Sequence, residues 1–173
     1  MSEVTRVYAG RLAGMVVRGP ETDVIGRVRD VVVNVRPAGH QSRVLGLVVE
    51  MMNKRRIFLP MLRIASIDPH EIMLVSGSVS LRAFKPRTGE LTIMGDIIGA
   101  KVQVDDPDLP KIHAKPVEVA DIEIERTRPR DWAISAVAVI SERAKFGRRT
   151  EILIASWRHV HGITAAGVGI SDA

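Results

Sequence analysis

The chain contains no cysteine, few aromatic residues and no long apolar run. The absence of cysteine from 173 residues excludes disulfides, thiolate metal ligands and cysteine nucleophiles. Aromatic residues make up 3% of the chain, so it lacks the rings on which many single-stranded nucleic acid modules stack bases. A spanning helix needs about 20 apolar residues, whereas the run from Val44 to Val49 ends at Glu50. The N-terminus, Met1 to Arg6, does not resemble a secretory signal. We therefore expect a cytoplasmic protein.

What is present is the composition of a folded globular protein. The chain is 46% hydrophobic and 26% charged, whereas intrinsic disorder would combine few apolar residues with a large net charge. Its 25 Lys and Arg residues against 20 Asp and Glu residues give a formal net charge of +5. This charge permits contact with nucleic acid, anionic lipid or an acidic protein without requiring any of them.

Short segments rich in Val and Ile alternate with Gly, Pro and Asp, which predicts a mainly β fold. Met15 to Arg18 runs into the turn residues 19–23 and indicates a hairpin. A second hairpin is expected where the polar tip 52–56 separates Val44 to Val49 from residues 57–60. A single helical turn is expected at 61–64. Residues 77–90 break the β pattern and are interpreted as a linker, with room for a short helix at 78–84.

The apolar positions change parity inside one strand, and this happens twice. They alternate from Val24 to Val28 and then continue on the other parity from Val31, with Asp30 at the change. The same slip occurs around Asp121 in the stretch 117–124. Because side chains alternate strictly between the two faces of a strand, each slip predicts a β-bulge or a sharp bend.

A second alignment extends this internal repeat. Residues 57–64 align with residues 153–160, and the extra length in the second copy fits a longer hairpin tip at 142–150. The sequence therefore predicts two copies of one β module, with domains at 1–86 and 87–173, that pack together.

Three segments carry a resemblance to a known family. Residues 26–33, 44–49 and 56–60 (GRVRDVVV, VLGLVV and RIFLP) resemble the PRC-barrel, a family that includes the H subunit of photosynthetic reaction centres and the C-terminal domain of the ribosome maturation factor RimM. This resemblance implies two tandem PRC-barrel-like small β-barrels with short helical turns.

A second resemblance spans nearly the whole chain. Residues 7–12, 77–82, 104–109, 130–132 and 157–162 look like the N-terminal region of actinobacterial MgtE-type magnesium transporters and CBS-domain proteins. It implies a non-catalytic regulatory module, the cytosolic N-terminal part of a protein of magnesium homeostasis. The partners it implies are downstream MgtE-like helical domains or CBS domains.

Candidate chemical sites are sparse. Asp105, Asp106 and Asp108 are hard oxygen ligands suited to a divalent cation, but Asp and Pro also form ordinary turns, and we favour the turn. His159 and His161 would share one face of a strand, yet a zinc site needs a third ligand that the sequence does not supply. No phosphate-binding glycine loop or nucleophile elbow is present. We expect no enzyme activity and no cofactor.

The basic residues are the stronger candidates for partner binding. They lie at the two predicted hairpin tips and in the loop before Trp132, and the candidates are Lys54, Arg55, Arg56, Arg126, Arg128, Arg130, Arg148 and Arg149. One interpretation is that charge at hairpin ends discourages association between sheet edges. The other is an anion-facing patch for an acidic protein domain, lipid headgroups or RNA. An RNA- or ribosome-associated adaptor similar to RimM is the alternative function, and its binding would weaken steeply with salt.

Overall fold

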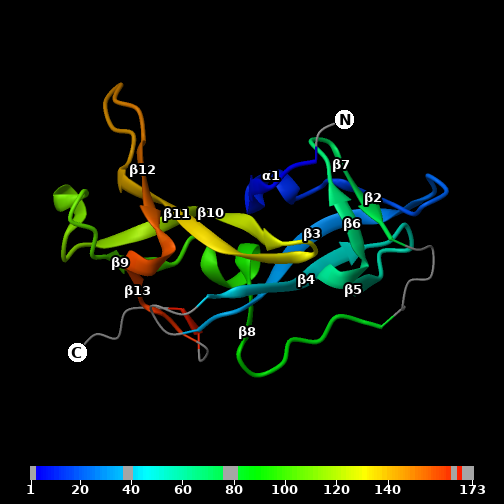
Figure 1. The fold of residues 1–173 in the computed structure, drawn as a ribbon. Helices are drawn as coiled ribbons and strands as arrows, with labels where there is room; N and C mark the ends of the chain where they lie inside the picture. The colour runs from blue at the N-terminus through cyan, green and yellow to red at the C-terminus, as the bar shows by residue number, and fades with distance from the viewer. Residues whose placement is uncertain (1–2, 37–40, 76–81, 165–166, 169–173) are drawn as a thin grey trace.

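The computed structural model describes residues 3–36, 41–75, 82–164 and 167–168, and these are mainly β structure (Figure 1). The first half contains β1 (Arg6–Tyr8), α1 (Ala9–Leu12), β2 (Val16–Arg18), β3 (Val24–Asn34), β4 (Arg43–Glu50), β5 (Arg56–Pro60), the 3-10 turn η1 (Met61–Arg63), β6 (Ile64–Ile67) and β7 (Glu71–Leu74). The second half contains β8 (Glu90–Thr92), the π-helical turn η2 (Ile93–Ile97), β9 (Lys101–Val104), η3 (Pro110–Ile112), β10 (Pro116–Arg128), β11 (Asp131–Glu142), β12 (Glu151–Ser156), η4 (Trp157–His159), β13 (Val160–His161), β14 (Ile163–Thr164) and β15 (Gly167–Val168).

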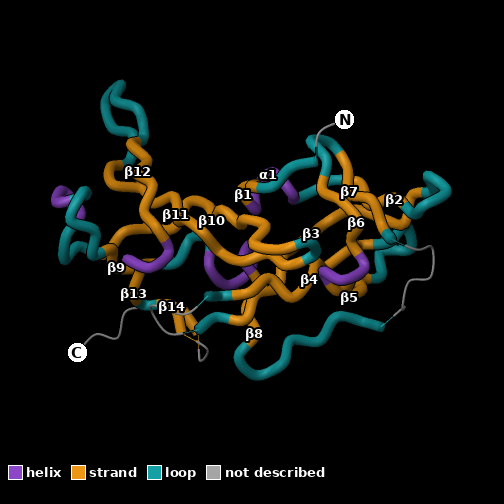
Figure 2. The backbone as a smooth tube through the Cα atoms, in the orientation of Figure 1, coloured by secondary structure: helices purple, strands orange, loops and turns teal. Residues whose placement is uncertain are grey.

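Strands from both halves belong to one sheet. In the described residues it has 13 strands, ordered β13-β9-β10-β11-β4-β3-β2-β7-β6, with β1, β5, β8 and β12 paired beside this path. The halves meet where Ala133 of β11 pairs with Arg43 of β4. Figure 2 shows how far strands dominate the backbone. The expected mainly β fold is confirmed, whereas the division into two tandem PRC-barrels is not.

At both parity slips the strand has a β-bulge, one of the two predicted alternatives. The register of β3 against β4 shifts between Val28 and Asp30, and that of β10 against β11 shifts between Val119 and Asp121. At each bulge the aspartate carboxylate accepts the backbone N–H of the next residue, at 2.8 Å in both cases. The bulge explains why the apolar positions change parity in the sequence. It inserts one extra residue, which turns the following side chains to the other face of the strand.

The two halves exchange their first strands. β1 pairs with β10 of the second half, and β8 pairs with β3 of the first half. Each exchanged strand leads into a short helical turn, α1 or η2, that ends before a glycine with positive φ: Gly14 at 83° and Gly99 at 91°. Both glycines then donate their N–H to the bulged strand of their own half, to Val28 and Val119 at 2.8 Å. The exchange is thus reciprocal.

The bulge aspartates hold the exchanged turns. The Asp121 carboxylate accepts the N–H of Gly10 at 3.0 Å, and the Asp30 carboxylate accepts those of Met94 at 2.8 Å and Gly95 at 3.0 Å. Leu12, from the first of these turns, and Ile97, from the second, are both fully buried in one continuous core. The two halves therefore share a core as well as a sheet.

The repeat is also visible after the bulged strands. β5 is followed by η1 and β6, and β12 by η4 and β13, as the alignment of residues 57–64 with 153–160 predicts. The hairpin tip between β11 and β12 is the longer one, as expected. One difference between the halves is that β7 separates β2 from β6, whereas β13 pairs directly with β9. Most of the predicted helix at 78–84 lies outside the described residues, and its described end at Ala83 forms an antiparallel bridge to Ile57.

Candidate functional site: a basic cleft in the second half

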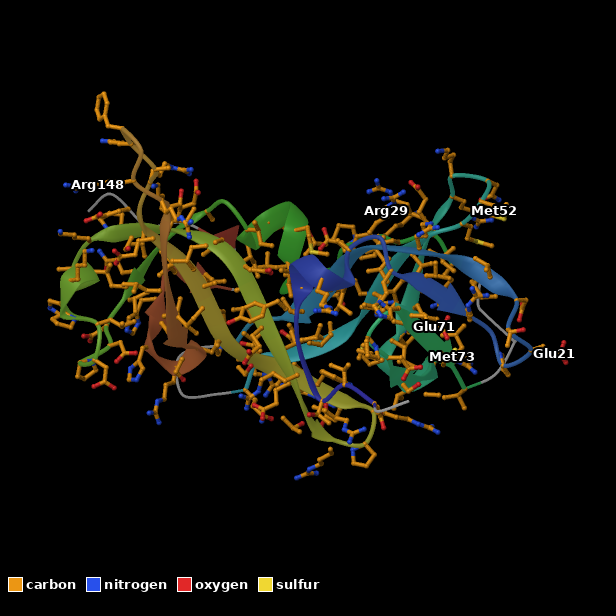
Figure 3. All side chains as sticks on the ribbon, turned by 90° about the horizontal axis from the view of Figure 1, so that it is seen from above. Glu21, Arg29, Met52, Glu71, Met73 and Arg148 are labelled. Carbon is orange, nitrogen blue, oxygen red and sulfur yellow. The ribbon has the colours of Figure 1, made fainter. Side chains whose placement is uncertain are left out.

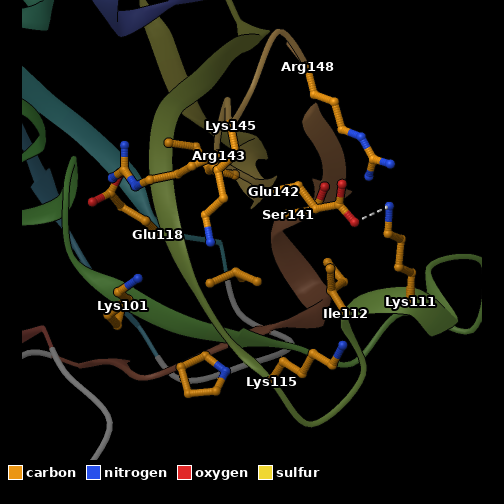
Figure 4. Close-up of a pocket in the computed structure, with 13 residues that line it drawn as sticks. Lys101, Lys111, Ile112, Lys115, Glu118, Ser141, Glu142, Arg143, Lys145 and Arg148 are labelled. Carbon is orange, nitrogen blue, oxygen red and sulfur yellow. Dashed lines mark hydrogen bonds and ion pairs between the residues drawn. The ribbon is translucent and has the colours of Figure 1, made fainter. Parts of the chain in front are cut away.

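A cleft of about 560 Å³ opens beside β9, η3, β10 and the hairpin that joins β11 to β12 (Figure 4). Six of its 13 lining residues are basic: Lys101, Lys111, Lys115, Arg143, Lys145 and Arg148. The lining also includes two carboxylates, Glu118 and Glu142, together with Ser141 and several aliphatic side chains. The cleft is therefore predominantly cationic but mixed in charge.

Four segments of the chain bring these side chains together. Lys101 begins β9 and pairs with Glu118 of β10, and Lys115 is the residue before β10. Lys111 comes from η3, and the remaining basic residues come from the β11–β12 hairpin tip. Figure 4 shows Lys115 and Arg148 on opposite sides of the opening.

Part of the charge in the cleft is already paired. Arg143 forms an ion pair with Glu118, and Lys111 contacts Glu142 at 3.2 Å and Glu151 at 2.9 Å. The hydrogen bonds that Lys111 donates to the Glu151 and Glu142 carboxylates raise the pKa of Lys111 above its usual value. The hydrogen bond from Lys111, and then that from Ser141, lowers the pKa of Glu151. This network fixes Lys111 at the edge of the cleft.

Four basic residues of the cleft form no ion pair with another of the described residues, and they are Lys101, Lys115, Lys145 and Arg148. Because these like charges face one opening, their repulsion is relieved when an anion occupies it. The cleft can therefore bind an anionic group by charge and hydrogen-bond donation.

The structure separates the predicted partner-binding residues. Of the eight, Arg148 lines the basic cleft, and Arg149 is exposed beside it. Lys54 lines a smaller cleft of about 180 Å³ at the other hairpin tip, where Arg56 lies 3.6 Å from Glu50. The backbone N–H of Arg55 donates to Asn53 at 3.0 Å. Figure 3 shows Arg148 at one end of the molecule and Met52, from the other tip, at the opposite end.

The three arginines before Trp132 lie at the far end of the β10–β11 hairpin from the cleft. Arg126 forms an ion pair with Glu3, Arg128 is exposed at the end of β10, and Arg130 occupies the turn with φ of 61°. Sequence reasoning missed Lys101, Lys111 and Lys115, because their spacing carries no signal. Only the antiparallel register of β9 and β10, with η3 between them, brings them together.

The acidic and histidine candidates adopt ordinary local structure. The Asp106 carboxylate accepts the N–H of Asp108 at 2.9 Å, which is the side-chain bond of an Asx turn. His159 ends η4 and His161 lies in β13, so the expected common strand face was wrong. Within the described ranges, no three His, Cys, Asp or Glu side chains are grouped to hold a metal ion. No helix in that part of the chain is long and apolar enough to cross a membrane.

Residues 91–166 match the family described as Actinomycetes SH3 domain, and this segment contains the whole basic cleft. No curated protein matches the chain. The match overturns the resemblance to the PRC-barrel and to MgtE-type proteins. The motifs that suggested it are short Val-rich and Ile-rich strands interrupted by tight turns. Such motifs are shared by many small β-barrels because strong curvature imposes them.

Proposed function

We propose that the chain is a non-catalytic interaction module that binds an acidic segment of a partner protein in its basic cleft. The observation that carries this proposal is the convergence of six Lys and Arg side chains from four segments of the chain on one opening. Four of them lack an ion pair among the described residues, so a carboxylate-rich segment would supply the missing counter-charges.

The lining of the cleft favours a protein over RNA. None of its residues is aromatic, so bases would find no ring on which to stack. Glu118 and Glu142 would repel a continuous phosphate backbone, whereas a peptide can place neutral residues opposite them and carboxylates opposite the lysines. An RNA-associated adaptor remains the alternative that the experiment must separate.

The cleft also differs from a groove for proline-rich peptides. Such grooves are lined by aromatic side chains. In the matched segment Trp132 is buried with 3% of its surface exposed, and the Trp157 indole N–H donates to Ser42 at 3.1 Å. Neither ring lines the cleft, so charge rather than proline stacking supports the proposed recognition.

Binding of fluorescein-labelled decaglutamate, followed by anisotropy at low salt, tests the proposal. The unaltered protein should bind it. Lys115→Glu and Lys145→Glu together reverse two cations that have no ion pair among the described residues, and they should weaken binding at least tenfold. Arg128→Glu is the matched control. It makes the same kind of change at an exposed arginine far from the cleft and should leave the affinity within about twofold.

A structured RNA hairpin is titrated in parallel. Tighter binding of the hairpin than of decaglutamate, with a steep salt dependence that the double variant removes, would establish the RNA alternative instead. Failure of decaglutamate to bind, or equal weakening by the Arg128 control, contradicts the proposed role of the cleft.

A further inference from the structure

The outer edge of β12 carries two exposed isoleucines. β12 pairs with β11 on one side, and no backbone hydrogen bond within the described part of the chain reaches its other side. Ile152 and Ile154 lie two residues apart, hence on one face, with 51% and 52% of their surface exposed. Edges of this kind are ready templates for another strand, and proteins normally cover or blunt them.

The equivalent edge in the first half is covered by the chain itself. Ala83 forms an antiparallel bridge to Ile57 of β5. Phe58 donates its N–H to the carbonyl of Arg82 at 3.3 Å, and Phe84 donates to the carbonyl of Arg56 at 3.2 Å. The centroids of the Phe84 and Phe58 rings lie 6.3 Å apart. An extended segment with an aromatic side chain is therefore what this edge accepts.

The correspondence between the two edges follows from register. Phe58 pairs with Val48, which pairs with the bulge residue Asp30. Ile154 pairs with Ala138, which pairs with the bulge residue Asp121. Ile154 therefore corresponds to Phe58, and by the same count Ile152 corresponds to Arg56. The N–H of Ile154 and the carbonyl of Ile152 should point outward, as their counterparts do.

We propose that the edge of β12 binds an extended segment of a partner protein as an additional antiparallel strand. Its bulky apolar side chain lies against Ile152 and Ile154, as Phe84 lies against Phe58 in the first half. The antiparallel direction carries the C-terminal end of the segment toward the hairpin tip that bears Arg148 and Arg149 (Figure 1). Acidic residues after the apolar one therefore complement this surface.

The probe is the peptide Leu-Arg-Ala-Phe-Ser-Glu-Glu, which keeps the sequence of residues 81–84 and adds an acidic end. It is titrated to millimolar concentration into the ¹⁵N-labelled full chain. We expect amide shifts in β12 and exchange of the Ile154 N–H slowed at least tenfold. Methylating the peptide nitrogen of Phe should abolish binding, because that N–H bonds the edge, whereas methylating the nitrogen of Ala should not.

Two protein variants complete the test. Ile154→Pro removes the outward N–H without removing a bond to β11, and it should abolish peptide binding. Ile154→Thr keeps the N–H and a β-branched side chain and should weaken binding less than Ile154→Pro. If Ile154→Pro unfolds the chain, the methylated peptides still decide the question.

A different partner at the β12 edge would give a different result in these experiments. If two copies of the chain pair through β12, the Ile154 amide is protected at high protein concentration and released by dilution, which overturns the partner-segment proposal. Absence of shifts in β12 at millimolar peptide, or equal binding of both methylated peptides, also overturns it. Decaglutamate binding depends on the cleft and not on strand pairing, so the two proposals can fail separately.

Discussion

Asp30 and Asp121 occupy equivalent bulges and bind reciprocal parts of the molecule. Asp30, from the first half, accepts backbone N–H groups of Met94 and Gly95, and Asp121, from the second half, accepts that of Gly10. Each carboxylate also accepts the N–H of the residue that follows it. The same residue type at the same bulge therefore ties each half to the turn contributed by the other.

Replacing Asp30 with alanine should destabilise the fold by about 2–3 kcal/mol, because three backbone N–H groups lose a charged acceptor. Asp121→Ala removes two such bonds and should cost about 1–2 kcal/mol. Urea unfolding of the full chain measures both values. Asp108→Ala, at an exposed turn, is the control and should stay within about 0.5 kcal/mol. A loss below that value for Asp30→Ala would contradict its role in holding η2.

Residues 1–86 and 87–173, produced as separate fragments, should each unfold without cooperativity. Alone, each fragment exposes a core to which the other contributes Leu12 or Ile97, and loses the partner of β1 or β8. Mixing them in equal amounts should restore a single cooperative transition by circular dichroism. Cooperative melting of either fragment alone would show that the exchanged strand is not needed for its fold.

The Lys111–Glu151 contact should make stability depend on pH in the acidic range. Because the pKa of Glu151 is lowered in the folded state, its carboxylate stabilises the fold above about pH 4.5, and this contribution is lost as the pH falls through the folded pKa. The stability difference between the unaltered chain and Glu151→Gln should therefore shrink on acidification. A carbon-detected titration should also show the Glu151 pKa rising in Lys111→Met. An unchanged pKa there would exclude Lys111 as the cause.

The Ser42 hydroxyl joins the two halves, and replacing it with an apolar side chain should destabilise the fold. It is fully buried, accepts the backbone N–H of Arg36 at 3.1 Å and accepts the Trp157 indole N–H at 3.1 Å. Ser42→Ala leaves both donors without this acceptor and should cost about 1–3 kcal/mol in urea unfolding. Trp157→Phe removes one of the two donors, so Ser42→Ala should destabilise the Trp157→Phe variant less than it destabilises the unaltered chain. Equal costs in both backgrounds would mean that the indole bond contributes nothing.

Local features of the fold could be predicted from the sequence, and the long-range ones could not. The parity changes at Asp30 and Asp121 specify the bulges, because side-chain alternation is a property of the strand itself. The exchange of β1 and β8 leaves little local signal beyond the glycines at 10, 14, 95 and 99, which repeat with the same spacing. The family resemblance failed for a related reason, since strand and turn patterns report curvature and not the partners of each strand.

For the candidate sites too, the sequence predicted local features and missed long-range ones. The sequence alone identified the basic hairpin tip with Arg148, since clustered charges are visible in a linear chain. Tertiary structure alone decided that Lys101, Lys111 and Lys115 face that tip across one cleft. It also decided that, among the described residues, the outer edge of β12 is open whereas that of β5 is covered. Composition and alternation fixed the local β structure of this protein. Strand pairing across about 100 residues decided its interlocked core and its surfaces, because such contacts depend on which segments meet after the chain has collapsed.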